Sequence, residues 1–233
     1  MRLELLGAGV VVRTADGGSR TLLHPVTVTL TERRVAVVGA NGSGKSTLVR
    51  LLNGLVQPSV GTVLVDGLDT VRDGAAVRRQ VGFVFTDPDA QLVMPTPVED
   101  VALSLRRTVP AAERDAAARA ALTRLGLAEH AEVPVHALSG GQKQLLALAG
   151  VLAVDPAVLV CDEPTTLLDL RWRRVVDELL EALPQQVVLV THDLAAAERA
   201  DRVLVVDEGR VVADDVGPAA VATYQRLMSA RPV

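Results

Sequence analysis

One eight-residue segment constrains the fold of this chain more than any other. Residues 39–46 read Gly-Ala-Asn-Gly-Ser-Gly-Lys-Ser and fit the pattern G-x-x-x-x-G-K-[ST]. The segment follows the apolar run Val35–Val38, a predicted strand, and precedes a predicted helix at Thr47–Asn53. Glycines in such a loop let the backbone curl until its N–H groups point inward around a phosphate at the helix start. The segment therefore predicts a phosphate-binding strand–loop–helix unit.

The polar residues of this segment have distinct expected roles. Lys45 supplies a point charge near the β- and γ-phosphates, and the Ser46 hydroxyl can ligate Mg²⁺. Lysine is rare in this chain, since Lys45 and Lys143 are the only two among 24 basic residues. A lysine in such a composition indicates a place where a compact ammonium fits and a guanidinium does not. The residues of the segment expected to contact nucleotide are Gly39, Asn41, Gly42, Ser43, Gly44, Lys45, Ser46 and Thr47.

The rest of the chain alternates short apolar runs with helical patterns, which predicts an α/β fold with a mainly parallel sheet. Several runs are almost entirely Val and Leu, as expected for central strands buried on both faces. The predicted strands are Val26–Leu30, Val35–Val38, Thr62–Val65, Val81–Phe85, Val158–Cys161, Val187–Val190, Val203–Val206 and Val211–Ala213.

The middle of the chain has a different pattern. From Pro97 to Ala153 the periodicity is helical, and an Ala-rich helix is expected to open at Pro110 and end at Gly126. We therefore expect a helical subdomain at about 86–155, inserted into a core formed by about 1–85 and 156–233. Because no repeat or linker divides the sequence, residues 1–233 are expected to form a single domain.

Composition excludes several classes of protein. The net charge is −4, which disfavours a nucleic-acid binder that relies on a broad basic surface. The longest apolar run, Leu145–Val154, stops at Asp155 and is too short to span a bilayer. Cys161 is the only cysteine, so an internal disulfide is excluded. The first 12 residues lack a signal-peptide cleavage pattern, and we expect a soluble, cytosolic-type chain.

A second motif places two carboxylates at the end of an apolar strand. Asp162 and Glu163 directly follow Val158–Cys161. Beside a phosphate loop, Asp162 would hold Mg²⁺ through water, and Glu163 could polarise the water that attacks the γ-phosphate. The same residues could simply mark where a strand leaves the core.

A third motif, Leu-Ser-Gly-Gly-Gln at residues 138–142, precedes the helix predicted from Lys143 onward. A Ser-Gly-Gly helix start offers N–H donors and a favourable dipole to an anion. The alternative is an ordinary serine N-cap followed by loop glycines.

In this order, the three motifs resemble those of the nucleotide-binding subunit of ATP-binding-cassette (ABC) transporters. The resemblance covers nearly the whole chain and implies a phosphate-loop (RecA-like) NTPase core, with a small antiparallel β subdomain beside the inserted helical one. It implies ATP and Mg²⁺ as cofactors. It also implies a dimer, formed by two copies or with a related ATPase, and no nucleic-acid partner.

The resemblance also suggests individual roles. Ser139 and Gly141 would contact the γ-phosphate that the partner protomer's phosphate loop holds, and Gly140 and Gln142 would belong to the same nucleotide-binding motif. His192, after the strand Val187–Val190, resembles the family's switch histidine, and would join Glu163 and Lys45 in catalysis. Residues 166–169 resemble the loop through which two protomers communicate.

Residues 81–92 and 94–101 are similar to a narrower group, the energy-coupling-factor ATPases. These serve the uptake of vitamins and transition metals, often biotin or cobalt. They work with an integral membrane transport subunit and a substrate-binding membrane subunit. The similarity implies a peripheral subunit at the cytoplasmic face of the cell membrane that powers uptake of a small vitamin or metal ion.

Three features depart from the family pattern. Thr86 stands where the family has a glutamine that reaches Mg²⁺, so a metal contact from Thr86 would need its hydroxyl or an added water. Leu167 replaces a residue that is usually small in the inter-protomer loop. No aromatic residue stands near the N-terminus to stack on adenine. Arg13 could stack there instead, and weak base selection is expected.

Two other functions stay open at this point. Non-transport ATPases of chromosome or repair machinery share the three motifs, but they insert long coiled coils between the phosphate loop and the Ser-Gly-Gly motif. Positions 46 and 139 are too close in this sequence for such an insertion. A weakly hydrolysing regulatory or assembly ATPase is the second alternative, which Thr86 and Leu167 would suit.

Overall fold

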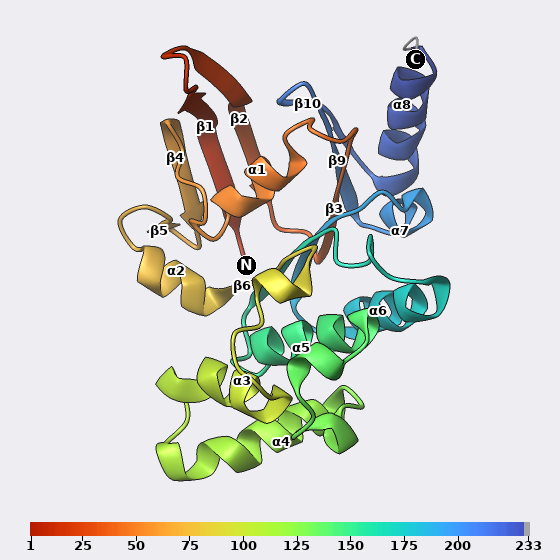
Figure 1. Cartoon of the computed structure of the whole chain (residues 1–233). Helices are drawn as coiled ribbons and strands as arrows, with labels where there is room; N and C mark the ends of the chain where they lie inside the picture. Colours follow the sequence, from red (N-terminus) through yellow and green to blue (C-terminus); the bar gives the residue numbers. More distant parts are fainter. Residues whose placement is uncertain (231–233) are drawn as a thin grey trace. The chain divides into compact units, whose positions relative to one another are not determined.

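The structure, a computed structural model, describes residues 1–230, and the chain divides into two compact units (Figure 1). The first unit comprises residues 1–81, 157–163 and those from 184 onward. The second comprises residues 82–156 and 164–183.

The first unit contains an antiparallel sheet, which the family resemblance implied. Its strands lie in the order β2-β1-β4-β5, with bounds β1 (Leu3–Arg13), β2 (Ser19–Leu30), β4 (Val60–Val65) and β5 (Leu68–Asp69). Leu3 pairs with Leu30 on one side and with Val65 on the other, and all three side chains are fully buried. Leu3 and Leu5, two positions apart on β1, are therefore both buried in the core, as the period of a strand requires, whereas Leu6 is exposed.

The first unit also contains a mainly parallel sheet. Five of its strands lie in the order β10-β9-β3-β8-β7, with bounds β3 (Arg34–Val38), β7 (Val158–Asp162), β8 (Gln186–Val190), β9 (Arg202–Asp207) and β10 (Arg210–Asp215). Strand β3 runs parallel to both neighbours, and only β10 is antiparallel to its partner. Every residue of β7 is buried. The expectation of central Val- and Leu-rich parallel strands is confirmed.

Four helices belong to the first unit: α1 (Lys45–Leu51), α2 (Gly74–Gln80), α7 (Leu194–Glu198) and α8 (Gly217–Ser229). Ala197 of α7 and Val221 of α8 pack into one buried cluster with Val203 and Val205 of β9. Helix α1 starts at Lys45, two residues before the predicted start, because Gly44 adopts a left-handed conformation that turns the chain directly into the helix. The prediction of a helix at Thr47–Asn53 was therefore wrong in its bounds.

The second unit is helical apart from strand β6 (Val81–Val84). The first residue of β6, Val81, still belongs to the first unit. Its α-helices are α3 (Pro97–Ser104), α4 (Arg114–Arg124), α5 (Gly140–Leu152) and α6 (Leu170–Ala182). Short 3₁₀ helices connect them: η1 (Pro88–Ala90), η2 (Leu105–Arg107), η3 (Ala111–Glu113), η4 (Ala128–His130) and η5 (Val135–Ala137). The chain turns after α4 at Gly126, whose φ is +73°, as the sequence predicted.

Several parts of the fold were not predicted, among them strands β1 and β5 and helix α2. Strand β1 was missed because Gly7 and Gly9 interrupt its apolar pattern, and the register with its neighbours shifts there. Residues 164–183, with α6, group with the helical unit, whereas the sequence suggested one inserted segment at about 86–155. Among residues 1–230, no helix combines the length and the apolar character needed to cross a membrane.

Candidate active site

The phosphate loop is shaped by close backbone approaches at two glycines. At Gly39 an added Cβ would overlap the carbonyl oxygen of Val206 in β9. At Gly44, where φ is +106°, an added Cβ would lie 2.8 Å from the carbonyl oxygen of Leu22. Because backbone atoms cannot yield as a flexible side chain can, only glycine fits both positions. The loop therefore takes its course from contacts with β2 and β9.

Lys45, the first residue of α1, is turned back into the loop and is only 4% exposed. Its ammonium donates hydrogen bonds to the carbonyl oxygens of Gly39 (3.0 Å) and Ala40 (2.9 Å), and its Nζ lies 3.7 Å from Glu163 Oε1. Burial lowers the pKa of Lys45 below its ordinary value, while the negative charges of Glu163 and Asp162 oppose the shift. A compact cation thus lies inside the loop.

Asp162, the last residue of β7, is 1% exposed and receives hydrogen bonds on both carboxylate oxygens. The Ser46 hydroxyl donates to Oδ1 at 2.8 Å, and the Arg50 guanidinium donates to Oδ2 at 3.0 Å. The sequence analysis missed Arg50. Its position was a usable signal, because residues four apart on α1, such as Ser46 and Arg50, share one helix face.

The Ser46 hydroxyl and the Asp162 carboxylate fit Mg²⁺. Mg²⁺ prefers oxygen ligands and usually keeps several waters, using one or two protein groups together with substrate phosphates. Within residues 1–230, no group of three His, Cys, Asp or Glu side chains could hold a metal alone. The donor pair therefore suits an ion that arrives with a nucleotide.

Glu163 lies where several elements meet. Its φ is +52°, a left-handed conformation uncommon outside glycine, and its N–H donates to the carbonyl oxygen of Val190 at the end of β8. This backbone turn brings Glu163 Oε1 within 2.9 Å of His192 Nε2, in addition to the contact with Lys45. The structure thus brings together the three residues predicted to be catalytic.

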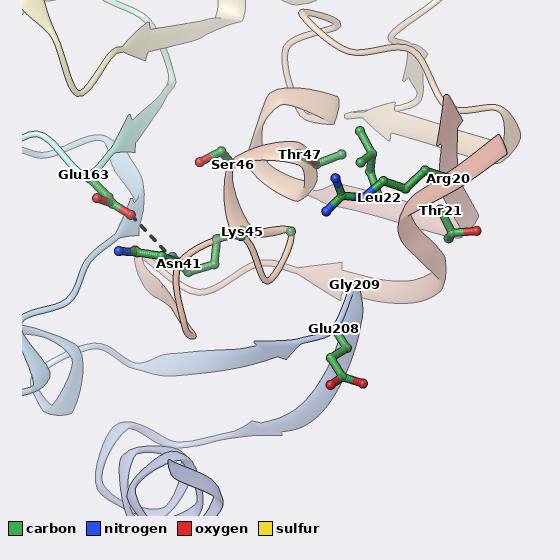
Figure 2. A pocket seen from close by; sticks show the side chains of 12 residues that line it. Arg20, Thr21, Leu22, Asn41, Lys45, Ser46, Thr47, Glu163, Glu208 and Gly209 are labelled. Carbon is green, nitrogen blue, oxygen red and sulfur yellow. Dashed lines mark ion pairs between the residues drawn. The ribbon is translucent and has the colours of Figure 1, made fainter. Parts of the chain in front are cut away.

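A cavity of about 530 Å³ opens beside these groups (Figure 2). Figure 2 shows Lys45 and Glu163 joined by their ion pair, with residues of β2 on one wall and the turn between β9 and β10 on another. The lining residues are Arg20, Thr21, Leu22, Asn41, Gly42, Gly44, Lys45, Ser46, Thr47, Glu163, Glu208 and Gly209.

Five of the residues predicted in the first unit do not line this cavity: Arg13, Gly39, Ser43, Asp162 and His192. Gly39 and Ser43 are part of the loop but do not face the cavity. Ser43 is buried, and its carbonyl oxygen accepts a hydrogen bond from the N–H of Gly209. Arg13, suggested as a platform for adenine, is also absent from the lining, where Arg20 of β2 is the arginine present. The sequence could not separate the two arginines, because each flanks the turn that joins β1 to β2.

The remaining predicted site residues lie in the second unit. Ser139 caps α5, accepting a hydrogen bond from the Gln142 N–H at 3.3 Å, and the Gln142 side chain accepts one from the Ser139 N–H at 2.8 Å. Ser139 and Gly140 are exposed, whereas Gly141 is buried. Thr86 follows β6 in this unit, and its role as a metal ligand stays a prediction.

The groups at the phosphate loop define a phosphate-loop nucleoside triphosphatase. They are a buried lysine within a glycine-rich loop, a hydroxyl and a carboxylate beside that lysine, and a glutamate at the end of a strand next to the cavity.

Comparison with known proteins narrows this class. The family model for ABC transporters matches residues 23–166. The biotin transport ATP-binding protein BioM of Rhizobium etli is 40% identical over 228 residues, covering 97% of this chain and 99% of BioM. An energy-coupling factor transporter ATP-binding protein, EcfA1 of Symbiobacterium thermophilum, is 47% identical over 207 residues, covering 84% of this chain and 72% of that protein.

The comparison with solved structures also finds ATP-binding-cassette proteins. CbiO1 of Clostridium perfringens, part of the transporter complex CbiONQ, superposes with a TM-score of 0.78 at 31% identity, covering 97% of this chain and 93% of that one. A dimeric ATP-binding cassette bound to ADP and phosphate superposes with a TM-score of 0.79 at 28% identity, covering 92% and 98%.

The chain belongs to the ABC transporter family. It has the α/β fold of the family's ATPases, and its activity is the hydrolysis of ATP, with Mg²⁺ as the usual partner ion, coupled to transport. The predicted family, fold, cofactors and enzyme class are confirmed.

Proposed function

We propose that this chain is the motor subunit of an energy-coupling-factor importer for a small vitamin or metal ion. The convergence of Lys45 and His192 on Glu163 Oε1 carries the proposal, because it is the arrangement of a competent hydrolytic site. The relatives named for biotin transport and energy coupling support the transport class. The importer would add an integral membrane transport subunit and a substrate-binding membrane subunit, with this chain at the cytoplasmic face.

In this proposal each charged residue has one task during hydrolysis. The loop N–H groups and Lys45 hold the β- and γ-phosphates, and Lys45 exchanges its carbonyl partners for phosphate oxygens. Bound Mg²⁺ would be held by Ser46 and Asp162 and would neutralise charge on the phosphates. Glu163 orients the attacking water as the general base, and His192 fixes the Glu163 carboxylate and contacts the γ-phosphate.

Two protomers would form the complete sites. Ser139 and Gly140 are exposed at the start of α5, where free N–H groups and the helix dipole favour an anion. We infer that residues 139–142 of each protomer contact the γ-phosphate bound by the other, in a homodimer or with a related ATPase. Structural neighbours that are dimeric ATP-binding cassettes support this arrangement.

Reconstitution tests the proposal. The chain is purified together with the membrane subunits that bind it and placed in vesicles with biotin or Co²⁺ outside. ATP-dependent uptake of either substrate is the expected result, and Glu163→Gln should abolish it. ATP hydrolysis without uptake of any vitamin or metal ion would contradict the importer assignment.

A weakly hydrolysing regulatory ATPase is the second candidate, and one observation favours it. Leu167, in the predicted inter-protomer loop, is 65% exposed where a small residue would allow closer packing. A steady-state ATPase rate for the isolated chain distinguishes the two functions, because a motor turns over many ATP molecules per protomer and a regulatory module does not.

A further inference from the structure

Two adjacent glycines at the start of α5 have very different surroundings. A Cβ added to Gly140 would meet no atom within 4 Å, whereas a Cβ added to Gly141 would overlap the indole ring of Trp172 at Cγ, Cδ2 and Cε2. Gly141 is buried and Gly140 is exposed. Packing against the indole ring therefore requires glycine at position 141, whereas nothing around position 140 does.

Trp172 is the only tryptophan of the chain and lies in the first turn of α6. The backbone N–H of Trp172 donates a hydrogen bond to Asp169 Oδ1 at 3.0 Å, so the N-cap residue of α6 holds the backbone of Trp172. The loop before it is fixed as well, because Arg173 Nε donates to the carbonyl oxygen of Leu168 at 2.9 Å. Trp172 thus connects the loop ending at Asp169 to the first turn of α5.

The first turn of α5 is also held by a second contact. Gln142 Nε2 lies 2.8 Å from His130 Nε2, and the capping box ties Gln142 to Ser139. With His130 and Trp172 both in contact with this turn, Ser139 and Gly140 are left exposed. Figure 1 shows α5 and α6 within the same helical unit.

We propose that Trp172 is a positioning residue for the Ser-Gly-Gly motif. Its indole ring sets the position of the Gly141 backbone and so directs the N–H groups of Gly140 and Gly141 toward the partner's phosphate. Through Asp169 it also makes the inter-protomer loop and the motif move together. The phosphate part of this inference rests on the proposed function, whereas the contact between Trp172 and Gly141 does not.

The first experiment tests the contact in the isolated protomer. Because Trp172 is the only tryptophan, fluorescence excited at a wavelength that Tyr224 does not absorb reports on the surroundings of Trp172 alone. Gly141→Ala should shift the emission maximum, because the new methyl group displaces the ring. Gly140→Ala is the matched control and should leave the spectrum unchanged. Identical spectra for both variants would overturn the proposal.

The second experiment tests the positioning role by a size exchange. Closure is measured as ATP-driven dimerisation by sedimentation, with every variant made in a Glu163→Gln background. Gly141→Ala should weaken closure about tenfold, and Gly141→Ala combined with Trp172→Leu should recover most of the loss. Trp172→Phe should keep most of the ATP-driven dimerisation, and the ATP affinity of the monomer should be the same in every variant. Losses that simply add in the double variant would overturn the positioning role.

The two experiments separate the possible failures. If the Glu163→Gln parent does not dimerise with ATP, the proposed composite site is wrong, and the fluorescence pair still decides whether Trp172 holds Gly141. If the parent dimerises and Trp172→Ala dimerises equally well, the composite site stands and the inference about Trp172 is wrong.

Discussion

The phosphate loop and the Ser-Gly-Gly motif are both glycine-rich helix starts, but they differ in the burial and the contacts of their residues. At the loop, the side chains of Lys45, Asp162 and Glu163 are largely buried, Lys45 forms an ion pair with Glu163, and Asp162 forms one with Arg50. At the motif, Ser139 and Gly140 face outward, and the contacts that hold this helix start involve Gly141 and Gln142. The first region assembles its own charged centre, whereas the second caps its own helix with Ser139 and Gln142 and presents Ser139 and Gly140 at the surface.

This difference indicates that the two regions should fail in different ways when altered. Changes at the loop should impair binding or chemistry within one protomer. Changes at the motif should leave the single protomer intact and impair only what two protomers do together.

The largest effect is expected from Glu163→Gln. The amide keeps the size of the side chain but loses the charge that orients the attacking water, so steady-state turnover should fall about 10²- to 10³-fold or more. ATP binding should persist, and the ATP-bound dimer should accumulate. The ATPase rate and sedimentation with ATP check both statements, with Glu129→Gln on the surface of η4 as control. Undiminished hydrolysis would remove Glu163 from the mechanism.

Lys45→Arg should come next and should lower ATP affinity or turnover by at least about tenfold although the charge is kept. The ammonium is 4% exposed and fits between two backbone carbonyl groups, where a planar guanidinium has no room. Equilibrium binding of a fluorescent ATP analogue measures the loss.

Lys143→Arg is the matched control, because Lys143 is the chain's other lysine and forms an ion pair with Asp89 at the surface of the helical unit. Its ATP affinity should match that of the unaltered chain. Equal affinities for all three proteins would show that position 45 has no need for a compact ammonium.

Ser139→Arg should affect only the second region. The exposed position tolerates a long side chain, so folding and monomer ATP affinity should be unchanged, while ATP-driven dimerisation should be lost. Sedimentation of the Glu163→Gln background with and without Ser139→Arg measures this. Thr123→Arg, on the exposed face of α4, should leave the dimer intact. A Ser139→Arg monomer unable to bind ATP would contradict the division between the two regions.

The smallest effect on binding is expected from Thr86→Gln. The phosphate loop supplies most of the groups that hold the nucleotide, so affinity should change by less than about tenfold, or ~1.4 kcal/mol. A longer amide that reaches the metal only in the closed state should raise the ATPase rate of the isolated subunit and weaken its dependence on the membrane subunit. The ATPase rate with and without that subunit measures the change. A strong shift in affinity with unchanged rates would make Thr86 a binding residue.

The sequence by itself determined the local parts of this protein. The loop at residues 39–46 was predictable because its motif occupies consecutive positions between a strand and a helix, and its glycines have positive φ. The Val- and Leu-rich runs identified the central strands because burial on both faces leaves no polar alternation. The carboxylates at the end of β7 and the capped start of α5 follow from the same short-range rules.

Tertiary structure decided everything that depends on which distant segments meet. Strand order brings Glu163 next to His192 and lets Arg50 donate a hydrogen bond to Asp162. It also places Arg20, and not Arg13, at the cavity. The need for glycine at position 141 but not at 140 came from Trp172, which lies 31 positions further along the chain. Such contacts leave no periodic trace in a single sequence, because side-chain packing is fixed only once the elements have docked.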